Sequence, residues 1–369
     1  MSIVVTTHNL PSLKLLPLGI AEFYDSSKKI ERKIQDLIEN IRILPTPEIL
    51  LAYSIQEEIF MARYKIGGQY NSEDDLQQKI HSRINSILKC QKQTQQFLQN
   101  DSHLQTSDVL SIHSILYNDS NPEPLRFRTT SVKLGNDSYH QVFLVPLEAQ
   151  HIEMYMEDLL SFLAAGDVPA IIKSAIFYTQ FLKIHPFVDG NGRSSRFISN
   201  LLLLRGNHIK DFYFSISPML EEHQFEYMKT SHLILEQGDW RPYLDFFLKR
   251  LEALLKKLEF IIDELINIER RLLKEIRIQY NSRVCRLLLD SLYLQPVGSK
   301  AKLRKDLDIN PIEFQRIFSK LLKSGLIKIH GDEYNFEFIS RLFSFRDWKS
   351  ESVISDGLIP PGLVPMRNL

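Results

Sequence analysis

Residues 185–196 bring together, in one short run, side chains of the types that support phosphate chemistry. Pro186 prevents a preceding helix from continuing, and residues 190–192 (Gly-Asn-Gly) predict a tight loop before a new helix that begins near Arg193. A helix N-terminus behind a glycine-rich loop binds anions, because its first backbone N–H groups have no partner within the helix. The segment therefore predicts a phosphate-binding turn.

Four side chains around this turn fit nucleotidyl or phosphoryl transfer. Arg193 and Arg196 are three residues apart, so both project from one helical face and can bind polyphosphate oxygens. Asp189 can hold a magnesium ion together with phosphate oxygens, since magnesium usually takes only one or two protein carboxylates. His185 is expected to titrate near neutrality and to act as the general base for a hydroxyl. A solvated helix–loop–helix turn is the alternative, but so many specific residues in so short a run disfavour it.

Residues 185–196 resemble the signature of the Fic family, His-x-Phe-x-(Asp or Glu)-Gly-Asn-Gly-Arg-x-x-Arg, at every defined position. The resemblance implies that His185 deprotonates a target hydroxyl and that Asp189 binds Mg²⁺. It also implies that the phosphates of ATP are bound by the loop and by the two arginines, namely Gly190, Asn191, Gly192, Arg193 and Arg196. The loop glycines favour nucleotidyl transfer, because the related Doc kinases replace them with Ala and Lys.

The function implied by this resemblance is protein adenylylation, the transfer of AMP from ATP to a Ser, Thr or Tyr hydroxyl of a protein target, with auto-modification included. Two alternatives stay open. The donor could supply a different group, such as UMP or phosphocholine, through the same scaffold. The protein could instead be a DNA-binding regulator whose Fic core only senses nucleotide, although a pure sensor would not need His185.

The only β-hairpin signal in the first three hundred residues lies at 129–145. Strands are expected at 131–134 and 142–145, with residues 135–138 (Gly-Asn-Asp-Ser) as the loop between them. An exposed strand edge beside an active site can capture an extended peptide. By the resemblance this hairpin is the Fic flap that clamps the target, which assigns target binding to Val132, Lys133 and Leu134.

Helical periodicity dominates the rest of the chain, so the fold class is mainly α, a Fic helical core with a hairpin flap. Helices are expected at about 26–44, 47–66, 73–99, 150–164, 168–184, 191–205, 219–237 and 242–275. The last carries a leucine seam that resembles a short coiled coil, which leaves a homodimer open, although packing on its own chain is preferred. The predicted domains are 1–100 (N-terminal helical region), 101–275 (catalytic core), 281–345 (winged helix) and 346–369 (tail).

The pattern after residue 280 predicts a winged helix-turn-helix. Three helices, with Asn310 as N-cap and Pro311 in the first turn of the third, precede two short strands at 326–329 and 334–338. Residues 274–341 contain thirteen Lys or Arg against eight Asp or Glu. The third helix offers Arg316 and Lys320, residue types that bind DNA, but such modules also bind proteins.

An inhibitory helix found in long Fic proteins is degenerate here. Its Ser-Ser-x-Ile-Glu-Gly motif is best matched at residues 63–68, where Gly67 replaces the glutamate that pairs with the second motif arginine. The looser match of Ser54 with Glu58 lacks the following small residue. Autoinhibition by this helix is therefore not expected.

Bulk composition excludes several classes of protein. The formal net charge is zero, which argues against a chain that wraps nucleic acid throughout its length. Two cysteines far apart in sequence build neither a disulfide framework nor a zinc site. With no signal peptide and no apolar run long enough to cross a bilayer, a reducing cytoplasm is the expected location and no membrane partner is expected.

Overall fold

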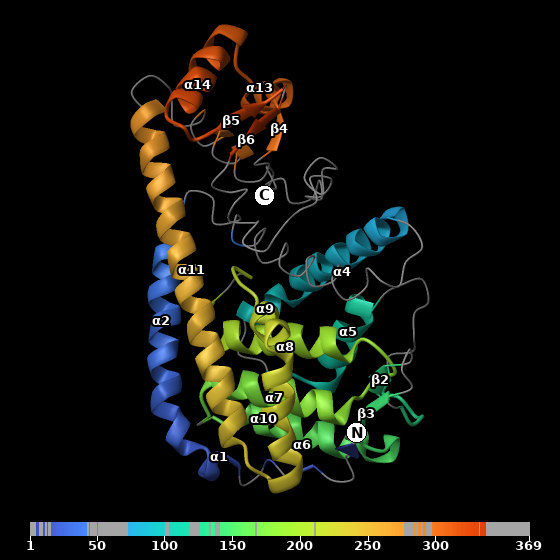
Figure 1. Cartoon of the computed structure of the whole chain (residues 1–369). Coiled ribbons are helices and arrows are strands. Elements are labelled where there is room, and N and C mark those ends of the chain that lie inside the picture. Colours follow the sequence, from blue (N-terminus) through green and yellow to red (C-terminus); the bar gives the residue numbers. More distant parts are fainter. Residues whose placement is uncertain are drawn as a thin grey trace. The chain divides into compact units, whose positions relative to one another are not determined.

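The structure is a computed structural model, and it confirms a mainly helical chain with two small sheets (Figure 1). The residues that it describes are 5–6, 10–11, 13, 16–42, 44, 50, 73–99, 103–117, 126–132, 134–136, 141–166, 168–209, 212–276, 284, 287–288, 291–292, 297–331 and 333–336. They divide into two compact units, Met1–Asp36 with Glu58–Leu255 and Leu37–Glu57 with Lys256–Leu369. No helix in these ranges is long and apolar enough to span a bilayer.

The first unit is built mainly of helices. In chain order its helical elements are α1 Leu16–Gly19, η1 Ala21–Phe23, α2 Tyr24–Arg42, α4 Glu73–Gln99, α5 Thr106–Tyr117, η3 Ala149–His151, α6 Ile152–Ala164, α7 Ala170–Ile184, α8 Asn191–Gly206, α9 Ser217–Glu222, α10 Gln224–Gln237 and α11 Arg241–Ile276, of which α2 and α11 continue into the second unit. The predicted helix at 219–237 is wrong as a single element, because the backbone breaks at His223 (φ −115°, ψ 33°).

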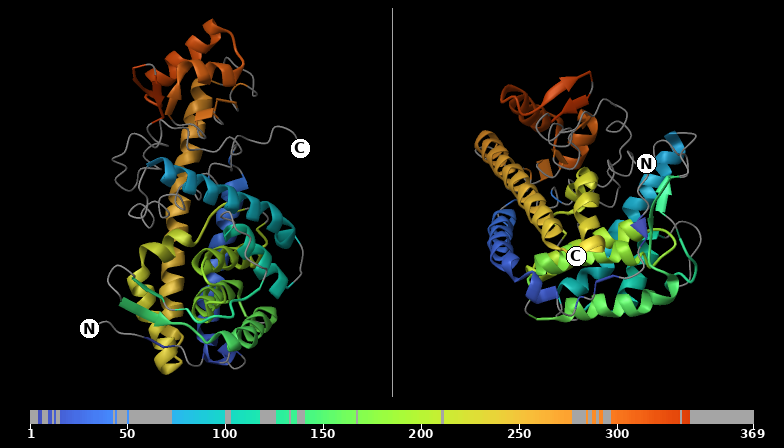
Figure 2. Two further views of the ribbon diagram at one scale, coloured as in Figure 1. Left: turned by 90° about the vertical axis from the view of Figure 1, so that its right-hand side faces the viewer. Right: turned by 60° about the horizontal axis from the view of Figure 1, so that its bottom comes forward.

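Helices α7 and α8 form the centre of this unit and are seen nearly end on when the view is turned (Figure 2, left). Gly206 of α8 lies so close to α7 that an added Cβ would be 2.0 Å from the Cβ of Ala170. The hydroxyls of Ser174 and Ser199 are 2.8 Å apart, and each also donates to the other residue's backbone carbonyl. Small residues therefore allow the two helices that flank residues 185–190 to pack closely.

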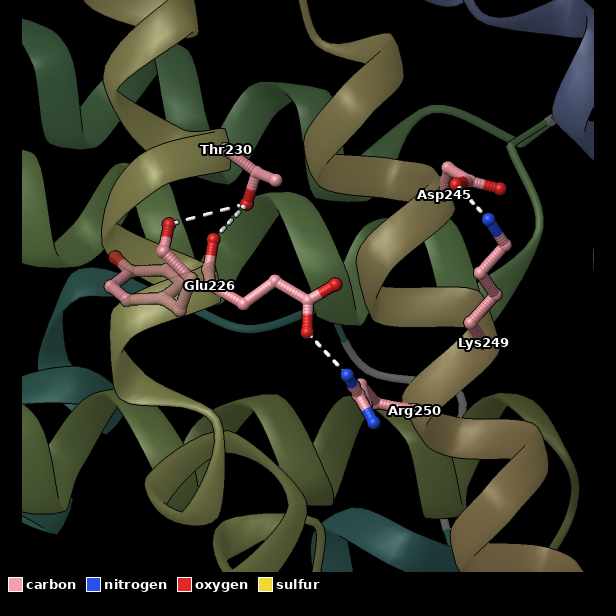
Figure 3. Close-up of polar contacts among 6 residues, drawn as sticks. Glu226, Thr230, Asp245, Lys249 and Arg250 are labelled. Carbon is pink, nitrogen blue, oxygen red and sulfur yellow. Dashed lines mark hydrogen bonds and ion pairs between the residues drawn. The ribbon is translucent and has the colours of Figure 1, made fainter.

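An ion pair joins helices α10 and α11 (Figure 3). The guanidinium of Arg250 in α11 pairs with the Glu226 carboxylate in α10, and Lys249 bonds Asp245 one turn away within α11. The Tyr243 hydroxyl of α11 donates to the carbonyl of Ala175 in α7 at 2.7 Å. The seam residues of α11 are buried within the chain, as expected for a helix packed on its own chain: Leu251, Leu254, Leu258, Ile261, Leu265 and Ile268.

A three-stranded sheet lies in the first unit, with strand order β1-β3-β2. Strands β2 (Leu134–Asn136) and β3 (Gln141–Val145) pair antiparallel, which confirms the predicted hairpin. Strand β2 begins at Leu134 instead of at the predicted residue 131, so Gly135 and Asn136 belong to this strand and not to the loop. Strand β1 (Val5–Thr6) adds a parallel edge to β3, and this two-residue strand carries no periodicity that the sequence could reveal.

The described part of the second unit contains strand β4 Val297–Ser299, helices α13 Lys300–Leu307 and α14 Pro311–Lys323, and strands β5 Lys328–His330 and β6 Glu333–Asn335. Asn310 is the N-cap of α14, as predicted, and its side chain accepts a bond from the Glu313 N–H at 2.9 Å. The strands form an antiparallel sheet in the order β4-β6-β5, so the predicted hairpin gains a third strand. The winged-helix assignment stays a prediction.

Candidate active site

The predicted base, His185, lies directly after the last turn of α7. Its backbone is left-handed (φ 52°, ψ 60°), and its N–H closes the helix on the Phe181 carbonyl at 2.8 Å. Ring Nδ1 is 3.2 Å from the Leu182 carbonyl oxygen. Because a carbonyl can only accept, Nδ1 carries the proton and Nε2 is the basic nitrogen.

Burial lowers the pKa of His185 to about 4. The nearby Arg128 guanidinium lowers this pKa further, while the bond to Leu182 and the Asp189 carboxylate oppose the shift. The imidazole is therefore neutral at pH 7, the form that a general base requires. The sequence-based expectation that it titrates near neutrality is wrong for this structure, because the sequence pattern does not reveal that the ring is buried.

Asn191 holds the loop through its side chain. Its Oδ1 accepts the Phe187 N–H at 2.9 Å and its Nδ2 donates to the Phe187 carbonyl at 2.7 Å. The carboxamide is thus used within the protein, so the part of Asn191 left for a phosphate is its backbone N–H in the first turn of α8. Gly190 precedes it in a left-handed conformation with φ 78°.

Aromatic side chains pack against the loop at residues 187–190. The Phe187 ring stacks on His113 of α5 with centroids 3.5 Å apart and planes 3° apart. His113 Nδ1 lies 3.1 Å from the Ser194 hydroxyl in α8. A Cβ on Gly190 would lie 2.9 Å from Cε1 of His113 and 3.1 Å from Cδ2 of Tyr117, so only glycine fits there without displacement.

Both motif arginines come from the first turns of α8. Nη1 of Arg193 donates to the Leu116 carbonyl at 2.8 Å, and its guanidinium carbon lies 5.2 Å from the Tyr117 ring centre. A Cβ on Gly192 would lie 3.2 Å from Nη1 of Arg196, so that guanidinium lies beside the first turn of the helix. Two cations therefore surround the N-terminus of α8, where a polyphosphate would be bound.

Asp189 is the acidic residue of the loop. Its side chain is 70% exposed, its Oδ1 accepts the Gly190 N–H at 2.6 Å, and its Oδ2 is 4.0 Å from Nη2 of Arg193. Within the described residues no group of three or more His, Cys, Asp or Glu side chains could hold a metal ion. A lone exposed carboxylate beside a phosphate site still fits Mg²⁺, which completes its coordination with phosphate oxygens and water.

Comparisons with known proteins match the part of the chain that contains these residues. The family model described as Fic/DOC family matches residues 103–203, the stretch that contains α5 to α8 except for the last turn of α8. Residues 103–203 are a Fic domain. It is 28% identical over 154 residues to protein adenylyltransferase fic-1 of Caenorhabditis elegans, and 27% identical over 155 residues to protein adenylyltransferase Fic of Nematostella vectensis.

These matches cover part of each protein. They span 41% and 40% of this chain but only 28% and 33% of the two relatives, respectively. Among solved structures, a Fic family protein from Desulfovibrio desulfuricans aligns with a TM-score of 0.49 and 17% identity, over 84% of this chain and 95% of that chain.

The Fic domain includes three contributors that the motif alone did not predict: His113, Tyr117 and Arg128. The first two lie on α5, which the sequence reasoning omitted. Its signal was present in the apolar spacing of Val109, Ile112 and Leu116, and in Asp108, whose carboxylate accepts the Gln105 N–H at 2.8 Å. Arg128 had no such signal, because its partners are backbone carbonyls.

Not all of the predicted site residues can be placed. The backbone of Leu134 begins β2 and pairs with Leu144 of β3, and Val132 is half-buried just before it. Lys133 lies outside the described residues, as do Gly67 and the segment expected to be the inhibitory helix. Target binding by the flap and the meaning of Gly67 remain predictions.

Proposed function

We propose that this protein is a protein adenylyltransferase that transfers AMP from ATP to a hydroxyl of a protein target. The observation that carries the proposal is the neutral His185, with Nδ1 bonded to Leu182 and Nε2 basic, in the loop that leads to the cationic N-terminus of α8. Two relatives named protein adenylyltransferase support the choice of reaction. A cytoplasmic location is part of the proposal.

In this reaction Nε2 of His185 accepts the proton of the target hydroxyl as the hydroxyl oxygen attacks the α-phosphorus of ATP. The bond from the α-phosphorus to the oxygen that bridges the α- and β-phosphates breaks, and pyrophosphate leaves. The N–H groups that begin α8, together with Arg193 and Arg196, hold the phosphates and neutralise charge that develops on them. Asp189 would hold Mg²⁺, which supplies further charge neutralisation when bound. The hairpin β2–β3 would receive the target segment as an added strand.

The proposal also assigns the parts of the chain. Residues 101–275 would form the catalytic core, residues 1–100 the N-terminal helical region, residues 281–345 a winged helix and residues 346–369 a tail. Of these, the core holds every described residue of the candidate site. The other parts are therefore expected to act on regulation or on partner choice instead of on the chemical step.

A labelling experiment tests the reaction. The purified protein is incubated with Mg²⁺ and ATP labelled at the α-phosphate, alone and with cell extract, and covalent label is followed. We expect labelling that His185→Ala abolishes while ATP binding survives, since base and phosphate site are separate groups. Label from the γ-phosphate but not the α-phosphate would contradict adenylylation, and the mass added to the product distinguishes AMP from UMP or phosphocholine.

A second function, DNA binding through α14, is favoured by one observation. One side of this helix lines a shallow groove with two apolar residues, Pro311 and Ile312, and five polar or basic ones: Gln315, Arg316, Ser319, Lys320 and Lys323. A helix of this composition can enter the major groove of DNA and neutralise phosphates.

DNA binding is tested with the full chain by fluorescence anisotropy of a labelled duplex at two salt concentrations. We expect affinity that falls steeply with salt, and falls further in the double variant Arg316→Ala, Lys320→Ala. Lys249→Ala is the matched control, because it removes an exposed charge of α11 outside the groove. Equal affinity for the double variant and the control would reject α14 as the DNA-binding surface.

A further inference from the structure

Arg128 is a buried arginine beside the active site, with only 6% of its surface exposed. Its guanidinium donates to four backbone carbonyls. Nε bonds His185 at 2.7 Å, Nη1 bonds Thr130 at 2.7 Å, and Nη2 bonds both Leu147 and, at 3.4 Å, Ile184. Four of the five N–H groups of the fork are therefore engaged.

Two of these carbonyls belong to the end of α7 that carries the base. Pro186 ends the helix, and His185 adopts a left-handed backbone that costs free energy in a residue with a side chain. Arg128 bonds the carbonyl of His185 through Nε, and its own backbone N–H donates to the Pro186 carbonyl at 2.8 Å. Two successive peptide groups of the motif are thus fixed by one residue.

The other two carbonyls flank the hairpin. Thr130 precedes β2, and Leu147 follows β3 by two residues. The same side chain therefore bonds the residues on both sides of the hairpin and the carbonyls of Ile184 and His185 at the end of α7. A buried cation is costly unless its donors are satisfied, and an apolar side chain could fill the same volume. Because the donors of the Arg128 guanidinium are bonded to these carbonyls, we infer that the side chain fixes their relative positions and does not only fill space.

We propose that Arg128 is a positioning residue that sets the β2–β3 hairpin and the His185 base at a fixed separation. The inference rests on the proposed function, in which the hairpin receives the target and His185 accepts its proton. The target hydroxyl must arrive within hydrogen-bond distance of Nε2, so a shift between hairpin and base would slow transfer without weakening the phosphate site. Arg128 makes none of its hydrogen bonds to α8, which supplies the phosphate ligands.

Two variants separate positioning from folding. Arg128→Lys keeps the charge but has at most three donors on one nitrogen, so it cannot reach all four carbonyls. Arg128→Gln removes the charge and keeps one planar donor group. Tyr243→Phe is the matched control, because it deletes another buried hydrogen bond to α7, at Ala175, away from the motif.

The first readout is the rate of auto-labelling with α-labelled ATP, measured beside ATP binding and thermal stability. We expect Arg128→Lys to slow labelling by about tenfold and Arg128→Gln by about a hundredfold, the loss typical of a misplaced catalytic group. The ATP dissociation constant should change by less than about twofold, or about 0.4 kcal/mol, because the hydrogen bonds of Arg128 do not involve α8. Tyr243→Phe should lose stability but keep its rate. Wild-type rates in folded Arg128→Lys and Arg128→Gln would overturn the inference, as would a rate loss in Tyr243→Phe that matches theirs.

The second readout needs no activity. Amide hydrogen exchange of β2 and β3 and the NMR signals of the His185 ring are compared in the same proteins. Both should change together in Arg128→Lys and neither in Tyr243→Phe. If the wild-type protein transfers nothing, the proposed function fails, but this readout still tests whether Arg128 links the hairpin to His185. Unchanged amide exchange of the hairpin in Arg128→Lys would reject that link. Should Arg128→Gln not fold, Arg128→Lys decides alone.

Discussion

Single residues of the motif loop are held by hydrogen bonds within the loop itself. The Asn191 carboxamide bonds both backbone groups of Phe187, and the Phe187 ring stacks on His113. The family signature gives the identity of such residues but not this division of labour. Asn191 resembles a phosphate ligand in the sequence, but in the fold its side chain holds the loop in place. A loop that is already rigid binds an anion at a lower cost in conformational entropy.

The buried His185 predicts an unusual pH dependence of transfer. Its neutral form is the base, and burial lowers its pKa to about 4, so protonation removes activity only as the pH falls toward that value. We therefore expect kcat/KM to change by less than about twofold between pH 5.5 and 7.5 from this group, because it is over 95% neutral there. The measurement is auto-labelling at subsaturating ATP across this range. An acid limb with a midpoint near 6.5 would show that the ring is solvated in the active protein.

Gly190→Ala should damage both the loop and its chemistry. The substitution forces a left-handed φ of 78° on alanine and places Cβ 2.9 Å from His113. Strain and contact together are expected to lower the free energy of unfolding by about 1–3 kcal/mol and to slow transfer. Chemical denaturation and auto-labelling measure the two effects.

Gly238→Ala is the matched control for this prediction. Gly238 has φ 66°, but a Cβ there meets no atom of the described residues within 4 Å, so the control carries backbone strain without the contact. We expect a smaller stability loss, near 1 kcal/mol, and unchanged transfer. Equal losses in the two variants would mean that His113 and Tyr117 yield easily and that the contact does not matter.

At the scale of elements, periodicity predicted most helices and tertiary context decided the rest. Helix α4 spans the predicted residues 73–99, and α7 and α8 end within two residues of expectation. The short strands β1 and β4 were missed, because two or three residues carry no period and owe their conformation to the strand beside them. The predicted 219–237 helix divides at His223, where no Gly or Pro marks the break.

Helix α14 offers a test of local sequence signals. Asn310 caps it by accepting the Glu313 N–H at 2.9 Å, so Asn310→Ala leaves that donor without its capping partner. We expect a loss of about 0.5–2 kcal/mol from the second unit, measured by calorimetry of the full chain. Asn310→Asp should keep most of the stability because its carboxylate also accepts. Equal unfolding curves for the Ala and Asp variants would show that the cap contributes nothing.

At the scale of the whole molecule, the Fic motif predicts the family resemblance and the chemistry of one unit. It says less about how transfer would be regulated. The regulatory position that the family resemblance suggests lies outside the motif, and its effect would depend on where the fold places it. Gly67 is the position that the family resemblance connects to Arg196, and it lies outside the described residues. Its role is accordingly a prediction from sequence.

Gly67→Glu should inhibit transfer if residue 67 faces Arg196 as the resemblance implies. A glutamate there would form a charge-assisted pair with the guanidinium and place negative charge where the γ-phosphate of ATP must lie. The natural glycine does neither, so the protein is expected to be active without a release step. A coupling above about 1.4 kcal/mol would slow transfer at least tenfold.

Gly67→Ala is the control for this substitution, because it changes backbone freedom without adding charge and should keep the wild-type rate. Inhibition by the glutamate should weaken as ATP rises, since carboxylate and γ-phosphate compete for one cation. Auto-labelling rates across a range of ATP concentrations therefore distinguish competition from a folding defect, which would persist at saturation. Equal rates in Gly67→Glu and wild type at subsaturating ATP would mean that residue 67 does not face Arg196.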